Sequence, residues 1–140
     1  MESFLGRYST YIYAILRIVS GFVFMLHGAQ KFFGYPPNPA GKAAGALDTL
    51  MTVGAGIELI GGFLIMIGLF ASIAAFISSG MMAVAYFMEH QPQGLWPPTN
   101  GGDAAVLYCF IFLYIASRGS GIWSVESTFK GSRSAAANGG

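Results

Sequence analysis

The sequence predicts an all-α integral membrane protein, a four-helix bundle with both termini on the cytoplasmic side. Three observations predict this fold class. The chain of 140 residues is 54% hydrophobic and only 9% charged, whereas a soluble domain carries about a quarter charged residues to cover its surface. Its apolar residues form long runs separated by stretches rich in proline, glycine and polar residues. Most of its lysines and arginines lie near the two chain ends.

The first expected span covers residues 11–33. A helix of that length measures roughly 34 Å, enough to cross a hydrocarbon core of roughly 30 Å. Pro36, Pro37 and Pro39 end it, because proline supplies no backbone donor and restricts the residue before it. We do not expect a cleaved signal, because Glu2 precedes an apolar run longer than the core of a signal peptide.

A long apolar run, residues 50–88, predicts two spans rather than one. As a single helix it would measure roughly 58 Å, about twice the thickness of the hydrocarbon core. A tight turn is therefore expected to divide it into spans 50–68 and 72–88. Gly68 would end one helix, and Ser72 is available to cap the next.

The last expected span, residues 103–118, is short, at roughly 24 Å. Residues 1–130 are expected to form a single transmembrane domain. The tail, residues 131–140, is low in complexity, and we expect it to be disordered.

The orientation follows from the distribution of basic residues. Four spans place both termini on one side of the membrane, and cytoplasmic segments carry an excess of lysine and arginine. Four basic residues lie near the termini and two lie at the first loop: Arg7, Arg118, Lys130 and Arg133 against Lys31 and Lys42. The termini are therefore predicted to be cytoplasmic.

This topology brings most of the ionisable residues of the spans into the outer half of the bundle. A charge facing lipid is costly, so polar residues inside spans are expected to face the interior and are candidates for function. No catalytic residue can be assigned. The expected polar pocket comprises Arg17, His27, Lys31, Glu58, Glu89, His90, Asn100 and Asp103.

Glu58 is the only carboxylate deep inside a span. We expect it to pair with a cation of the first span. Its position favours Lys31 or His27 over Arg17, which starts near the opposite end of the bundle. Two interpretations stay open, a ligand pocket and a buried ion-pair network.

The remaining polar residues also have purely structural interpretations. Glu89 and His90 fit solvated positions at the membrane interface, and Asp103 fits the N-cap or first turn of the last span. No metal site is predicted, because the two histidines lack a ligand spacing such as HxxxH. A single cysteine, Cys109, excludes a disulfide, a CxxC pair and multi-cysteine zinc or iron–sulfur sites, and we find no haem motif.

Glycines are expected to let the helices approach closely. Small residues drive helix association in lipid, where the hydrophobic effect does not. The expected helix-packing glycines are Gly21, Gly28, Gly54, Gly61 and Gly62.

Three segments together resemble the DoxX family of small four-helix membrane proteins. They are LRIVSGFVFMLHGAQKFFG (residues 16–34), GIELIGGFLIMIGLF (residues 56–70) and NGGDAAVLYCFIFLYIASRGSGIWSVE (residues 100–126). In the last segment the family often has glutamate where this chain has Asp103. The positions that match the family's recurring polar residues are Arg17, Lys31, Glu58, Asn100 and Asp103, and none of them is an established catalytic residue.

The resemblance implies a multi-pass protein of the bacterial cytoplasmic (inner) membrane. It also implies a membrane subunit of a quinone-linked oxidoreductase or oxidative-stress system. The chain offers no cofactor of its own, so any redox activity would need a bound quinone or a partner protein. The expected partners are the lipid bilayer and either another protein of a membrane complex or further copies of the chain. The net charge of +1 gives no reason to expect nucleic acid.

Two other functions stay open. The chain could be a non-catalytic structural or assembly subunit of a larger complex, with its polar cluster serving as an ion-pair lock. It could also be a small transporter, although alternating access usually needs repeats and broken helices, and no repeat is obvious in the sequence.

Overall fold

The computed structural model describes residues 3–39, 47–137 and 139, and every regular element in these ranges is helical. Lys42, which contributes to the predicted orientation, lies outside the described residues. Three helical stretches are long and apolar enough to cross a membrane: Gly6–Phe33, Thr49–Ile67 and Ala71–Gln93. The predicted all-α, multi-pass membrane fold is confirmed at this level, while the number of crossings and the side of the termini stay predictions.

The first candidate span consists of a 3-10 turn, η1 (Gly6–Tyr8), and the long helix α1 (Ser9–Phe33). The helix ends at Gly34, which has a φ of 68° and donates its N–H to the carbonyl of Gln30. Glycine adopts this left-handed conformation without the steric cost that a side chain would bring. The proline-rich segment therefore follows a glycine cap rather than ending the helix by itself.

The second candidate span is a helix interrupted by one wider turn. It comprises α2 (Thr49–Gly56), the π-helical turn η2 (Ile57–Gly61) and α3 (Gly62–Ile67). The side chain of Asp48 accepts a hydrogen bond from the N–H of Met51 (2.8 Å) and so caps the start of α2. The span ends at Gly68, which has a φ of 70°.

The third candidate span begins with α4 (Ala71–Ala85) and continues through the π-helical turn η3 (Tyr86–His90) and the 3-10 turn η4 (Gln91–Gln93). The expectation that Ser72 caps this helix is wrong, because the N-cap residue is Phe70 and no side chain there acts as a cap. A carboxylate from a distant part of the chain accepts a hydrogen bond at this helix start instead. The N–H of Phe70 donates to Glu126 Oε1 (2.7 Å), because the start of the last helix lies against this turn.

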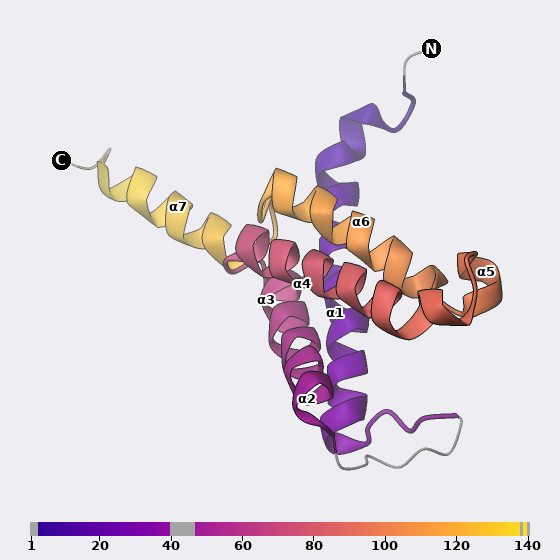
Figure 1. Cartoon of the computed structure of the whole chain (residues 1–140). Coiled ribbons are helices and arrows are strands. Elements are labelled where there is room, and N and C mark those ends of the chain that lie inside the picture. The colour runs from indigo at the N-terminus through magenta and orange to yellow at the C-terminus, as the bar shows by residue number, and fades with distance from the viewer. Residues whose placement is uncertain (1–2, 40–46, 138, 140) are drawn as a thin grey trace.

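The last part of the chain contains α5 (Pro97–Asn100), α6 (Asp103–Arg118) and α7 (Val125–Ala137). With 16 residues, α6 is the shortest of the four expected spans, and its crossing stays a prediction. The tail was expected to be disordered from residue 131, but residues 131–137 form the end of α7. Alanine favours helix, and α7 has no buried residue and projects away from the other helices (Figure 1).

The helices pack as two closely associated pairs. α1 lies along α2, η2 and α3, and α4 lies along α6, while η2 and α3 also contact α4 (Figure 1). Glycines allow the first pair to approach closely. A Cβ atom at Gly62 would lie 2.5 Å from the backbone nitrogen of Met25, and one at Gly28 would lie 2.5 Å from that of Leu59. Gly21 makes a similarly close approach, whereas Gly61 faces the hydroxyl of Ser78 on α4. A Cβ atom at Gly54 would make only an ordinary contact, 4.0 Å from Met81 Sδ.

Candidate functional site

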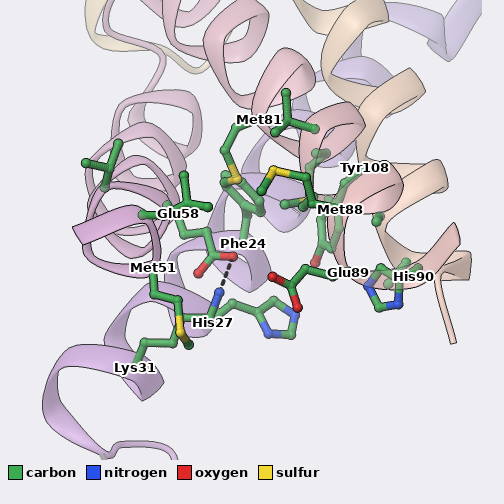
Figure 2. Close-up of a pocket in the computed structure, with 18 of the residues that line it drawn as sticks. Phe24, His27, Lys31, Met51, Glu58, Met81, Met88, Glu89, His90 and Tyr108 are labelled. Atoms are coloured by element: carbon green, nitrogen blue, oxygen red, sulfur yellow. Dashed lines mark hydrogen bonds and ion pairs between the residues drawn. The ribbon is translucent and has the colours of Figure 1, made fainter. Parts of the chain in front are cut away.

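A cavity of about 490 Å³ opens where the end of α1 meets η2, η3 and the start of α6. Its size is within the range of roughly 300–1,000 Å³ that is usual for small-molecule sites. Of the eight predicted pocket residues, five line it: His27, Lys31, Glu58, Glu89 and His90. Figure 2 shows their side chains around one space, drawn from three helical segments.

An ion pair between Lys31 and Glu58 forms the polar end of the cavity. Lys31 Nζ lies 2.7 Å from Glu58 Oε1 and donates a hydrogen bond to it (Figure 2). The expectation that Glu58 pairs with Lys31 or His27 rather than Arg17 is therefore confirmed for Lys31. The two partners differ in environment, because the side chain of Lys31 is 40% exposed and that of Glu58 only 6%.

The second carboxylate oxygen of Glu58 lacks a donor. Oε2 is buried and has no hydrogen-bond partner among the described residues. A buried acceptor without a donor costs free energy, and more so when it is charged. Rotation about the last side-chain bond would exchange the two oxygens but leave the same shortage. A buried acceptor at this cavity therefore has no donor among the described residues.

Two π-helical turns supply three of the ionisable residues that line the cavity. η2 carries Glu58, and η3 carries Glu89 and His90. A π turn accommodates an extra residue and re-aims the side chains around it, and such turns occur frequently at functional sites. Here both of the π turns in the described residues border the same cavity.

A hydrogen-bonded loop fixes one rim of the cavity. Asn100 is buried and donates from Nδ2 to the hydroxyl of Tyr86 (3.2 Å) and to the carbonyl of Gly94 (2.8 Å). Its Oδ1 accepts from the N–H of Gly102 (2.8 Å), and its carbonyl lies 3.2 Å from His90 Nδ1. Asn100 thus holds the loop between η3 and α6 and orients His90 without lining the cavity itself.

Apart from Asp48, most of the remaining wall is apolar and rich in methionine, with Met82 beside the labelled Phe24, Met51, Met81 and Met88 (Figure 2). Methionine is flexible and polarisable, and it adapts to ligands of irregular shape. Tyr108 of α6 also lines the cavity, with its ring centroid 5.3 Å from that of Phe24 and 6.1 Å from that of His27. Sequence reasoning did not single out Tyr108. The available signal was a tyrosine within an apolar span, near the end where polar residues gather.

Arg17 lies outside the cavity and serves a different purpose. Its Nη1 donates to the carbonyls of Ile65 (2.8 Å) and Met66 (2.7 Å), and its Nη2 to those of Ile122 (3.1 Å) and Trp123 (2.7 Å). The guanidinium group therefore joins the end of α3 to the segment that follows α6. The sequence-based pocket included Arg17, and the structure places it at the opposite end of α1 from Lys31.

Asp103 is likewise absent from the lining of the cavity. It is exposed and occupies the first position of α6, where an acid complements the helix dipole, and its neighbour Gly102 is the N-cap. This placement agrees with the structural interpretation of Asp103 as an acid in the first turn of the last span. Among the described residues, no group of three or more histidine, cysteine, aspartate or glutamate side chains is arranged to hold a metal ion.

These features define a multi-pass helical membrane protein with a partly polar cavity near one end of its helices. Comparison with known proteins gives the family, because residues 12–91 match DoxX. The chain is also 38% identical to an uncharacterized protein of Haemophilus influenzae over 128 residues, which cover 89% of this chain and 96% of that protein. The chain belongs to the DoxX family, as its sequence motifs indicated. No solved structure matches it.

Proposed function

We propose that this chain is a membrane subunit that binds a quinol or quinone in the cavity around Glu58, on behalf of a partner oxidoreductase. In this proposal α6 is the fourth span, the termini are cytoplasmic, and the cavity faces the outer leaflet of the bacterial inner membrane. The observation that carries the proposal is the incomplete hydrogen bonding of Glu58, a buried carboxylate beside a partly polar cavity.

The chemistry of the cavity suits both forms of such a ligand. A quinol hydroxyl would donate a hydrogen bond to the unsatisfied oxygen of Glu58. A quinone carbonyl would accept one from Lys31 or from the imidazole of His27, both of which line the cavity. The methionine and aromatic side chains would pack against the ring.

The chain's own residues bind and orient the ligand rather than carry electrons. A bound quinone supplies the two-electron chemistry that amino-acid side chains lack. The sequence has one cysteine and thus no dithiol, so electrons would be exchanged with a cofactor held by a partner protein. Glu58 and Lys31 lie close enough to share or pass on a proton of the bound ligand.

Extraction and direct titration test this proposal. The protein is purified in mild detergent, extracted with organic solvent and examined for quinones by mass spectrometry, and the stripped protein is then titrated with a ubiquinol-type ligand. Glu58→Gln should weaken binding of the quinol by about tenfold, the effect of one hydrogen bond to a charged group. Glu126→Gln is the matched control, because Glu126 also accepts a hydrogen bond but at the turn before α4. A stripped, folded protein that binds no quinol would refute the proposal.

Two observations favour a second candidate function, that of an assembly subunit. The close approach of α1 to α3 and the bonds of Arg17 to four carbonyls show how much of the polar and glycine content serves packing. In that case the Lys31–Glu58 pair would only hold α1 and η2 together and would bind no ligand. Native mass spectrometry of membranes carrying Lys31→Met, which removes the partner of Glu58, separates the two functions, because an assembly role predicts loss of partner subunits and a binding role predicts an intact complex that retains less quinone.

A further inference from the structure

A second cavity, of about 610 Å³, lies between α1 and α6. Its lining is almost entirely apolar and includes Ile15 and Val19 of α1 and Leu107 and Ile111 of α6. Val19 is 53% exposed and Leu107 63%, so the cavity is a groove that opens sideways, toward the lipid that surrounds a spanning helix. Contact between α1 and α6 is sparse compared with the contacts that each makes to its own partner helix.

The groove adjoins the polar cavity. Ala104 and Tyr108 line both of them. The ring of Tyr108 is stacked on that of Phe112, with the centroids 5.4 Å apart, and it packs on Phe24 from the side. Tyr108 therefore stands at the boundary between the two spaces, where its ring is held by neighbouring aromatic side chains.

We propose that this groove binds the hydrocarbon tail of the ligand whose polar head lies beside Glu58, and that the ligand enters laterally from the bilayer. This inference rests on the proposed function and specifies its substrate class: a lipid-soluble molecule with one hydrogen-bonding head and one long apolar chain. Water-soluble reductants of similar head size are excluded as preferred ligands, because they would leave the groove unfilled.

The dimensions of the groove fit such a chain. Its lining on α1 runs from Ile12 to Val23, which corresponds to roughly 16 Å along the helix. An extended hydrocarbon tail would lie along this length against branched aliphatic side chains. Ala104, at the junction with the polar cavity, leaves room because its side chain is a single methyl group.

Tail length is the variable that tests the inference. A ubiquinol-type headgroup without a tail and the same headgroup with a decyl tail are titrated against the stripped protein in one detergent. The ratio of the two affinities measures the contribution of the tail. Partition of the tailed ligand into the micelle affects this ratio equally in every variant, so differences between variants report on the groove. Leu107→Trp and Val19→Trp fill the groove from opposite walls, and Leu113→Trp is the matched control on an exposed part of α6 outside the groove.

We expect the tail to tighten binding by about tenfold in the unmodified protein, which corresponds to burial of one or two methylene groups beyond those covered by detergent. Leu107→Trp and Val19→Trp should each reduce this ratio to near one and leave binding of the tailless headgroup unchanged, and Leu113→Trp should preserve the ratio. If the headgroup binds but the ratio is the same in all variants, the inference is overturned, the groove is covered by bilayer lipid or another helix, and the Glu58 site stands. If neither ligand binds the unmodified protein, the proposed function itself fails.

Discussion

The Lys31–Glu58 ion pair allows a quantitative test through a double-mutant cycle. Lys31→Met removes the partner of a carboxylate whose side chain is only 6% exposed. Breaking a fully buried pair in this way costs about 3–5 kcal/mol. Because the side chain of Lys31 is 40% exposed, water already screens part of the interaction, and we expect Lys31→Met to lower the free energy of unfolding by about 2 kcal/mol.

The other two variants of the cycle should lose less unfolding free energy. Glu58→Gln keeps an acceptor for Lys31 and leaves the ammonium group partly in water, so it should cost about 1 kcal/mol. The double variant buries no charge and should also cost about 1 kcal/mol, because a buried ion pair can be replaced by neutral groups at little loss. The two residues are thus expected to be coupled by about 2 kcal/mol.

Reversible unfolding in mixed micelles, followed by the circular dichroism of the helices, measures all four proteins under one condition. Lys130→Met on the exposed helix α7 controls for the loss of a positive charge and should leave the unfolding free energy unchanged within about 0.5 kcal/mol. Strictly additive effects of the single substitutions, with coupling below about 0.5 kcal/mol, would refute the interpretation of the pair as a buried interaction.

Three further substitutions have distinct expected outcomes. Gly62→Ala forces a Cβ atom against the backbone of α1 and should cost about 1–3 kcal/mol of unfolding free energy, whereas Gly80→Ala, with free space around it, should be neutral in the same assay. Arg17→Met leaves four carbonyls without their donor and should lower the unfolding free energy by about 3 kcal/mol or more; a change below 1 kcal/mol would contradict its role. Asn100→Ala should speed amide hydrogen exchange of the segment that holds His90 by at least about tenfold, and unchanged exchange would show that this segment is ordered by other contacts.

Features that depend on the sequence alone were predictable. Length and hydropathy place the helices, and the first of them ends at Phe33, as expected. The division of the long apolar run near Gly68 follows from the thickness of a bilayer and from the readiness of glycine to adopt positive φ. The pairing of Glu58 with Lys31 was also within reach, because antiparallel helices bring the end of one span next to the start of the next.

Other features depend on contacts between segments distant in the sequence. The role of Glu126 as the acceptor for the N–H of Phe70 requires knowledge of where α7 begins in space. Arg17 was placed in the pocket because a charge inside a span suggests a site, whereas its partners are carbonyls, which every residue has and no sequence motif marks. The π turns around Glu58 and Glu89 have no reliable sequence signature either.

The two ends of α1 show why a buried charge does not by itself identify a binding site. Each Nη atom of Arg17 is bonded to two carbonyls, so only its Nε lacks a partner among the described residues, and the guanidinium group holds helix ends together. At the other end, Glu58 has one short bond and one unsatisfied oxygen, beside a cavity bordered by irregular turns. A charge whose hydrogen bonds are nearly complete stabilises the fold, and one whose hydrogen bonds are incomplete beside an open space has capacity left for a ligand. By this criterion we propose the Glu58 end as the binding end, although both charges lie inside an expected span.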